Sequence, residues 1–188
     1  PQLILYHIDR ENIPRIVMIE RKDSLSFIEF IRGKYKNATN LTYLELLISR
    51  MTEEEKEKLL HNSFDELWSN LWIHVDEVNQ RIKKEFVRSK EIFEKLKKGF
   101  MIGTDFHNLE TIIRVSPKNY TMNEWEIPKG RRSGQENNKD CAIREFTEET
   151  NIPPHKYKTI TNMIPLIEEY RGINNVRYKH IYYVGKIE

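Results

Sequence analysis

Residues 130–152 read GRRSGQENNKDCAIREFTEETNI, and this stretch is the most informative in the chain. Residues 140–150 have the pattern of a helix. Glu145, Glu148 and Glu149 are spaced i, i+3 and i+4, so one face of that helix presents three carboxylates. Like charges at this spacing repel each other. A divalent cation that prefers oxygen ligands is the natural way to offset that repulsion.

Cationic neighbours offer a second way to offset it. Arg144 and Lys139 can neutralise part of the acidic face, and such a face taken alone most often is simply solvated. The loop before the helix is itself basic. Cations beside a carboxylate-bound metal suit a polyphosphate substrate, because both neutralise charge on the phosphates and on the leaving group. The cations of this loop are Lys129, Arg131 and Arg132.

The spacing of the whole stretch resembles the Nudix box, Gly-x5-Glu-x7-Arg-Glu-hydrophobic-x-Glu-Glu-x-Gly-hydrophobic. Six of the seven fixed residues and both hydrophobic positions match. Asn151 stands where the family has Gly, and Asn is the next most tolerant residue of a left-handed helix end. The resemblance implies a Nudix hydrolase, whose fold is an α/β/α sandwich around a mixed sheet.

The resemblance also assigns roles within the box. Glu136 would pair with Arg144 and hold the loop against the helix. Either Glu145 or Glu148 would orient or deprotonate the attacking water, and the sequence leaves that choice open. The groups implied to hold Mg²⁺ or Mn²⁺ are Glu145, Glu148, Glu149 and the carbonyl of Gly130.

Patterns outside the box predict a Nudix domain in two segments, residues 1–23 and 101–188. The first segment predicts a hairpin of residues 2–8 and 15–20. The second predicts strands at 111–115, 124–127, 160–170 and 178–187. A further strand and helix normally complete the fold, and the chain starts without Met, so we expect a fragment truncated at both ends.

Residues 24–100 have a different period and predict an all-helical insertion. Apolar residues recur there at helical spacing, and Trp68 and Trp72 lie on one such stripe as expected core residues. Four Ser/Thr-x-x-Glu patterns match the capping box of a helix start. They begin at Ser26, Thr42, Thr52 and Ser63.

Beyond the box, the chain resembles the mRNA-decapping Nudix enzymes of large cytoplasmic DNA viruses, of the giant-virus, asfarviral and poxviral types. The similar segments are residues 20–35, 51–72, 125–130 and 178–182. The resemblance implies hydrolysis of capped mRNA to methylated GDP and 5′-monophosphate RNA. It also implies action in the cytoplasm of an infected host, and it identifies no protein partner.

A local basic segment fits an RNA substrate, although the whole chain carries a net charge of only +2. Residues 81–98 contain eight basic and three acidic residues, a net of +5. Such a helix can follow an RNA backbone, or it can be an ordinary solvated face. The candidate RNA contacts are Arg81, Lys83, Lys84 and Arg88. Trp125 and Tyr178 are candidates for stacking on the cap guanine, although strand aromatics usually pack in a core.

Composition excludes some classes and leaves others open. The single cysteine, Cys141, excludes a disulfide framework, and the apolar runs are too short to cross a membrane. Another Nudix substrate remains an alternative, namely a diphosphoinositol polyphosphate, a dinucleoside polyphosphate or a nucleotide sugar. A second alternative is an RNA-binding module with a decayed site, against which the retained box carboxylates argue.

Overall fold

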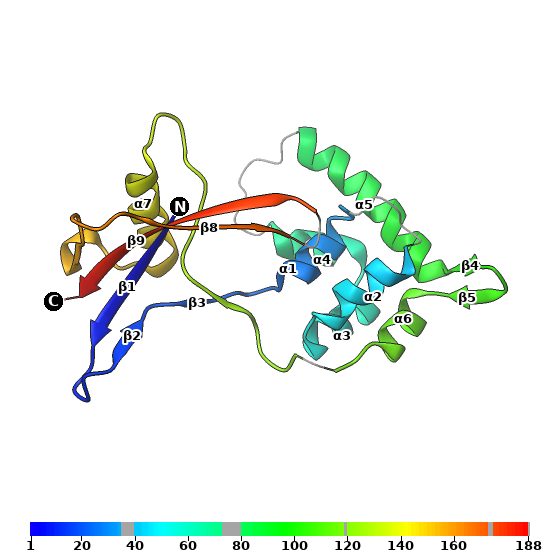
Figure 1. Cartoon of the computed structure of the whole chain (residues 1–188). Coiled ribbons are helices and arrows are strands. Elements are labelled where there is room, and N and C mark those ends of the chain that lie inside the picture. Colours follow the sequence, from blue (N-terminus) through cyan, green and yellow to red (C-terminus); the bar gives the residue numbers. More distant parts are fainter. Residues whose placement is uncertain (35–39, 73–79, 119, 173–174, 188) are drawn as a thin grey trace. The chain divides into compact units, whose positions relative to one another are not determined.

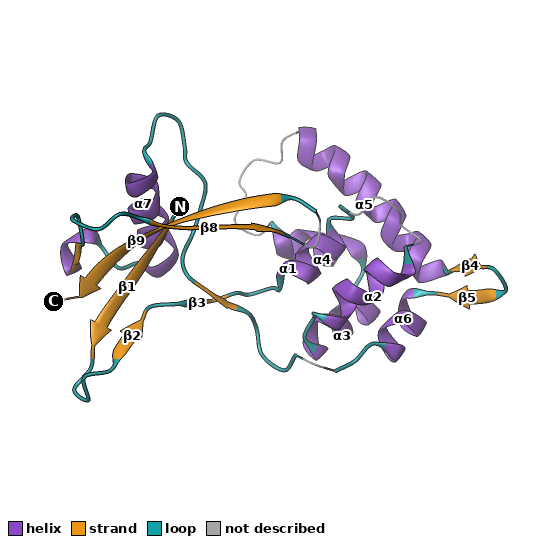
Figure 2. Ribbon diagram, in the orientation of Figure 1, coloured by secondary structure: helices purple, strands orange, loops and turns teal. Residues whose placement is uncertain are grey.

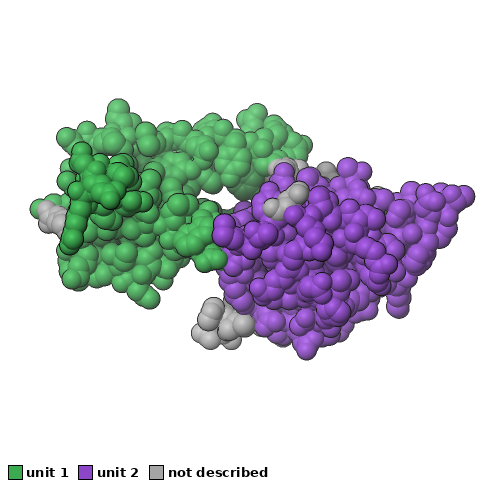
Figure 3. Space-filling model, turned by 90° about the horizontal axis from the view of Figure 1, so that it is seen from below, with its two compact units in different colours: residues 1–21, 125–188 green, residues 22–124 purple. Residues whose placement is uncertain are grey.

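The computed structural model describes residues 1–34, 40–72, 80–118, 120–172 and 175–187 (Figure 1). The chain forms two compact units, which Figure 3 distinguishes by colour. Unit 1 consists of Pro1–Arg21 and Trp125–Glu188, and unit 2 of Lys22–Glu124. Each unit has its own buried core, so the chain carries a mixed α/β unit and a mainly helical one (Figure 2).

Unit 1 is built on a mixed sheet whose strands run in the order β2-β1-β9-β7, with β8 also paired to β9. β1 and β9 are parallel, with Gln2 opposite Tyr182, and the other pairs are antiparallel. The strands are β1 (Gln2–Ile8), β2 (Pro14–Ile16), β7 (Tyr157–Thr159), β8 (Leu166–Arg171) and β9 (Arg177–Ile187). A short 3-10 helix, Pro154–Lys156, precedes β7.

The box helix α7 (Asn138–Thr150) packs against β1 and β9. It begins where the side chain of Asn137 accepts a hydrogen bond from the N–H of Asp140, and it ends at Asn151, whose φ is 57°. Asn151 therefore adopts the left-handed conformation expected from the sequence. The core of unit 1 joins one face of α7 to the sheet and consists of Leu3, Leu5, Ala142, Phe146 and Tyr157.

The chain passes between the units in two short strands that pair with each other. β3 (Ile19–Glu20) and β6 (Trp125–Glu126) form an antiparallel ladder, in which Ile19 faces Glu126 and Glu20 faces Trp125. Because successive side chains alternate between faces, Glu126 and Glu20 lie on opposite faces of this ladder.

Unit 2 packs its helices around one aromatic and aliphatic core, in which Phe64 contacts Trp68, Phe86 and Phe93. After α5, a hairpin of β4 (Phe100–Ile102) and β5 (Asp105–His107) leads to the last helix. The helices are α1 (Leu25–Ile31), α2 (Leu41–Ser49), α3 (Glu53–His61), α4 (Phe64–Leu71), α5 (Gln80–Lys98) and α6 (Leu109–Val115). Within the described residues, every helix is too short or too polar to cross a bilayer.

The prediction of a strand at residues 111–115 is wrong, because this run forms most of α6. Asn108 caps the helix: its side chain accepts from the N–H of Thr111, whose hydroxyl accepts from the N–H of Asn108. Leu109, Ile112 and Ile113 then bury one helical face. Unit 2 accordingly continues past residue 100 to Glu124.

Two of the four predicted helix starts are wrong by a few residues. Ser24 and Asn40 cap α1 and α2, so Ser26 and Thr42 lie inside these helices. The reciprocal capping boxes at Thr52 and Ser63 are confirmed.

The N-terminal hairpin is confirmed in part. β2 pairs with β1 but ends at Ile16. Val17 still donates its N–H to the carbonyl of Leu5 in β1, whereas Ile19 and Glu20 pair with β6 instead. The strand expected at residues 160–170 starts only at Leu166, after the separate strand β7.

Candidate active site

Gly130, the first residue of the box, lies in close contact with Glu145 of α7. A Cβ atom built on Gly130 would fall 1.7 Å from Cδ of Glu145 and 2.0 Å from both of its carboxylate oxygens. A side chain at residue 130 would therefore displace the Glu145 carboxylate from this position. The contact places the backbone of residue 130 beside one box carboxylate.

Arg144 neutralises three of the box carboxylates. Its guanidinium group donates to Glu136 from Nε at 2.8 Å and from Nη2 at 3.0 Å. Nη1 lies 2.9 Å from Glu145 Oε1 and 3.0 Å from Glu148 Oε2. The hydrogen bond from Arg144, followed by that from the N–H of Ser133, lowers the pKa of Glu136 to about 2. The pair Glu136–Arg144 thus ties the loop to the helix.

Glu149 has a different environment. Its Oε2 accepts a hydrogen bond from the N–H of Lys129 at 3.0 Å. Partial desolvation, assisted by the charge of Glu145, raises the pKa of Glu149, while the Lys129 N–H and the charges of Lys129 and Arg21 oppose that rise. Among the described residues, Glu149 makes no side-chain ion pair, unlike Glu145 and Glu148.

The donor groups fit a hard divalent cation, although they are not gathered around one point. Within the described residues, no three His, Cys, Asp or Glu side chains converge as a metal-binding group. The box nevertheless supplies carboxylate and carbonyl oxygens, which are the ligands that Mg²⁺ and Mn²⁺ prefer. Glu145 already lies against the backbone of Gly130, and Arg144 provides the positive charge between Glu145 and Glu148.

The basic loop divides into one anchored and two exposed cations. Arg131 and Arg132 are exposed, although the carbonyl of Arg131 accepts from Arg144 at 3.2 Å. Lys129 forms an ion pair with Glu126, which also pairs with Arg21. Sequence reasoning missed Arg21 and Glu126, because 105 positions separate them and no motif links the two.

The two cap-stacking candidates lie in different sheets of unit 1. Trp125 in β6 is 54% exposed. Tyr178 in β9 stacks on Tyr170 of β8, with ring centroids 5.4 Å apart and planes 19° apart.

The face of the hairpin that carries Tyr178 holds further polar aromatic groups, which sequence reasoning missed. Tyr182 donates to Glu168 at 2.6 Å, and His180 lies 3.3 Å from the same carboxylate. Desolvation and this carboxylate raise the pKa of Tyr182 to about 12. The alternation of Tyr178, His180 and Tyr182 along one strand was the signal that could have revealed this row.

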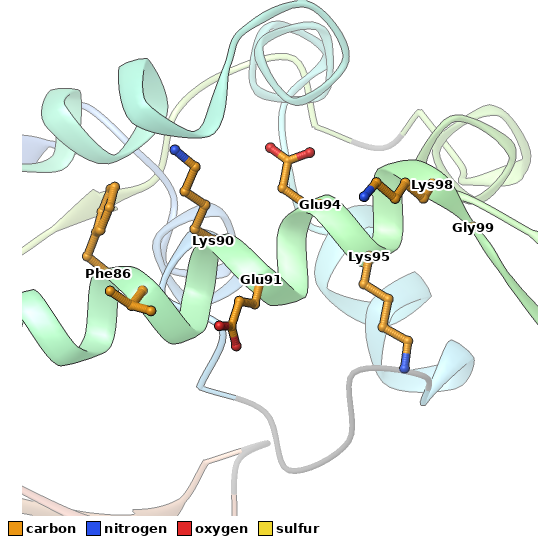
Figure 4. Close-up of a pocket in the computed structure, with 8 residues that line it drawn as sticks. Phe86, Lys90, Glu91, Glu94, Lys95, Lys98 and Gly99 are labelled. Atoms are coloured by element: carbon orange, nitrogen blue, oxygen red, sulfur yellow. The ribbon is translucent and has the colours of Figure 1, made fainter.

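The basic helix α5 belongs to unit 2 and has two shallow hollows along its solvent side. One, of about 530 Å³, extends from Phe86 to Gly99 between lysine and glutamate side chains (Figure 4). The other, of about 370 Å³, includes Lys83, Lys84 and Arg88.

The cations of α5 fall into two groups. Lys90 pairs with Asp65, and Lys97 donates to the carbonyls of Leu60 and Asn62, so both support the packing of unit 2. The others make no ion pair with any residue that the structure describes. They are Lys83, Lys84, Arg88, Lys95 and Lys98. Arg81 is exposed on the same helix, where its charge acts on Glu85.

The class of the domain follows from comparison with known families. Residues 110–186 match the NUDIX domain family, and the matched region contains the box helix α7. The resemblance read from the box is confirmed.

Individual relatives come from large DNA viruses. The chain is 30% identical to the mRNA-decapping protein g5R of African swine fever virus, over 90% of this chain and 64% of that protein. It is 32% identical to a provisionally named mRNA-decapping protein of Acanthamoeba polyphaga mimivirus, over 96% of this chain and 59% of that protein. The chain thus spans about three fifths of the length of the curated relatives it matches.

Proposed function

We propose that the chain is the Nudix part of a metal-dependent hydrolase that removes the 5′ cap of mRNA. One observation carries the chemistry: the box carboxylates and Arg144 are all present, and the Glu145 carboxylate lies against Gly130, where a side chain at residue 130 would displace it. The similarity to viral mRNA-decapping proteins carries the choice of substrate. The products are methylated GDP and RNA with a 5′-monophosphate.

The metal in this proposal is Mg²⁺ or Mn²⁺. Bound there, it would supply Lewis-acid stabilisation of the phosphate charge and lower the pKa of a water molecule. Glu145, Glu148, Glu149 and the Gly130 carbonyl would hold it. Arg144 would keep its two bonds to Glu136 while it yields Glu145 and Glu148 to the metal, and so preserve the attachment of the loop to the helix.

The reaction itself requires a water molecule to attack phosphorus and break one phosphoanhydride bond of the cap. Either Glu145 or Glu148 would orient this water or accept its proton. The cations Lys129, Arg131 and Arg132 would neutralise the charge on the departing diphosphate. Exposure of the two arginines leaves them available to phosphate groups.

RNA beyond the cap would bind along α5. Several of its cations, including Lys84 and Arg88, are exposed, pair with none of the acidic residues that the structure describes, and can attract a phosphate backbone without base specificity. Lys83 and Arg81 on the same helix would contribute to this attraction. In this proposal the helical unit, which extends over Lys22–Glu124 rather than only the expected 24–100, acts as an RNA-binding insertion in a Nudix sandwich formed by Pro1–Arg21 and Trp125–Glu188 instead of 1–23 and 101–188.

The cap guanine would stack on an aromatic side chain of unit 1. The exposure of Trp125 and the stacked pair of Tyr178 with Tyr170 make both sites chemically suitable. Since the substrate is mRNA, the proposed place of action is the cytoplasm of an infected host.

Cap cleavage by the full chain, measured with cap-labelled RNA and Mg²⁺ or Mn²⁺, tests the activity. We expect labelled methylated GDP from the unmodified protein and at least a hundredfold slower release from Glu148→Gln, because metal-site electrostatics supply a large share of such catalysis. RNA binding should survive this substitution. Hydrolysis that is unchanged in Glu148→Gln would contradict the site assignment, and binding without hydrolysis in the unmodified protein would favour an inactive RNA-binding module.

Two pairs of substitutions test the role of α5. Replacing Lys84 and Arg88 with Gln removes unpaired cations and should weaken RNA binding several-fold and reduce its salt dependence. Replacing Lys90 and Lys97 with Gln removes the same charge from side chains that already have partners. This control should lower stability and affect RNA binding less. If both double variants lost RNA binding equally, the exposed cations of α5 would not form a specific RNA-binding surface.

A diphosphoinositol polyphosphate serves as the competing substrate in the same assays. The basic loop suits it equally well, because it too is dense in phosphate charge. Turnover of this compound without cap cleavage would retain the Nudix chemistry and reject mRNA as the substrate.

A further inference from the structure

Glu126 has two cationic partners and little access to solvent. Its side chain is 16% exposed and forms ion pairs with Arg21, which follows β3, and with Lys129, the residue before Gly130. One carboxylate thus binds two cations that come from segments more than a hundred positions apart. Neither the box motif nor the proposed reaction gives Glu126 a role.

Both cations act electrostatically on Glu149. Lys129 is joined to this carboxylate through its backbone N–H, which donates to Oε2 at 3.0 Å, and the positive charges of Lys129 and Arg21 attract the Glu149 carboxylate. Nevertheless, Glu149 makes no side-chain ion pair among the described residues, since Glu126 takes the ammonium group of Lys129 and the guanidinium group of Arg21.

Loss of the charge on Glu126 would change this distribution. Lys129 has a long and flexible side chain, and its ammonium group is attracted to any carboxylate that remains within its reach. Glu149 is the acceptor to which Lys129 is already attached. A cation bound to Glu149 would compete with a divalent metal for the same oxygen atoms.

We propose that Glu126 is a positioning residue that holds Lys129 and Arg21 away from Glu149 and thereby keeps this carboxylate available to a divalent metal. The inference rests on the proposed function in one respect, namely that Glu149 is a metal ligand. It adds a carboxylate that does not bind the metal and acts only through the two cations.

Direct Mn²⁺ binding tests the inference without any turnover. The intact chain is titrated with Mn²⁺, and the free ion is measured by electron paramagnetic resonance. Glu126→Gln should weaken Mn²⁺ binding about tenfold, the size of effect that one close charge pair produces. Glu20→Gln is the matched control, because it removes the same charge from the opposite face of the same ladder. It should change the affinity less than twofold.

Lys129→Met distinguishes two explanations for a weaker Mn²⁺ affinity in Glu126→Gln: the loss of the group that positions Lys129, and the simple loss of a negative charge near the metal site. By itself Lys129→Met should raise Mn²⁺ affinity less than it does in the Glu126→Gln background, because Glu126 holds the ammonium group in the unmodified chain. Combined with Glu126→Gln, it should restore most of the lost affinity. Additive electrostatics predicts instead the same gain from Lys129→Met in both backgrounds, and that result would overturn the proposal.

Further outcomes distinguish this inference from the decapping proposal. If Glu126→Gln binds Mn²⁺ as well as Glu20→Gln does, the positioning role is wrong. If the unmodified chain binds no Mn²⁺, both the metal site and this inference are wrong. If Mn²⁺ binding behaves as expected but capped RNA is not cleaved, only the decapping proposal is wrong.

Melting curves establish that each variant is folded. Glu126→Asp, which keeps the charge, should retain more Mn²⁺ affinity than Glu126→Gln.

Discussion

At the scale of single residues, the box depends on the distribution of charge around Arg144. This side chain joins Glu136, Glu145 and Glu148, and the bond to Glu136 is the two-point contact that arginine forms best with a carboxylate. Repulsion between the acidic residues of α7 is therefore balanced from within the same helix. The sequence left two ways to offset this repulsion, a bound metal and a neighbouring cation. Both act on the same carboxylates.

The low pKa of Glu136 predicts how stability depends on pH. The folded value of about 2 lies below the ordinary value of 4.5. A lowered pKa stabilises the fold above the unfolded value, and that stabilisation is lost as the pH falls from about 4.5 towards 2. Melting temperatures of the unmodified chain and of Glu136→Gln should therefore differ at pH 7 and converge near pH 2. A constant difference across this range would contradict the assignment.

At the scale of elements, one buried carboxylate organises two helix starts in unit 2. Glu55 is 2% exposed and accepts from the N–H and hydroxyl of Ser24 and from the N–H of Thr52. Ser24 is the N-cap of α1 and Thr52 that of α3. Glu55 therefore satisfies backbone groups at the starts of two helices that are far apart in sequence.

Substitution of Glu55 tests this double cap. Glu55→Ala should destabilise unit 2 by about 3 kcal/mol or more, because it leaves buried donors at both helix starts without partners. Glu66→Ala, in the exposed capping box of α4, is the matched control and should cost about 1 kcal/mol. Chemical denaturation measures both, and equal costs would show that burial of Glu55 is not decisive.

The two capping patterns that the sequence misplaced share a physical cause. A capping box requires the Ser or Thr to be the N-cap, the residue directly before the first helical residue. In both helices a polar residue two positions earlier is the N-cap and accepts a hydrogen bond from a free backbone N–H. Ser24 caps α1 by accepting from Phe27, and Asn40 caps α2 by accepting from Tyr43. Sequence spacing could identify the helices, whereas tertiary packing selected the residue at which each begins.

The prediction of a strand at residues 111–115 failed for a different reason. A short apolar run is compatible with either a strand or a buried helix face, and only its packing distinguishes them. The box residues were predictable because their spacing lies within one loop and one helix. The contact between Arg21 and Glu126 was not, because it depends on the pairing of two strands distant in sequence.

At the scale of the whole molecule, the chain contains two separate cores. The core of unit 2 is made entirely of residues between Phe27 and Ile113, and that of unit 1 of residues from both ends of the chain. The ends of unit 2 are also tied together, since Glu124 accepts from the N–H of Leu25 at 3.1 Å. Unit 2 therefore has a hydrophobic core of its own and ends that contact each other, as a compact domain does.

Residues 22–124 expressed alone should fold. They retain the whole of their core and number about 100, which is ample for an autonomous domain. A cooperative melting transition in circular dichroism and dispersed amide resonances would support this. A molten or non-cooperative fragment would mean that unit 2 depends on unit 1 for its structure.

The parallel pairing of β1 with β9 has a consequence for the order in which the chain acquires structure during translation. Gln2 leaves the ribosome early but must wait for Tyr182 before its ladder can form. Helices α1 to α6, whose contacts are largely local in comparison, are complete before α7 has been synthesised. The helical unit thus folds first on the nascent chain. The sheet on which α7 packs closes last, because the central ladder of unit 1 stays incomplete until Tyr182 and its neighbours in β9 have been synthesised.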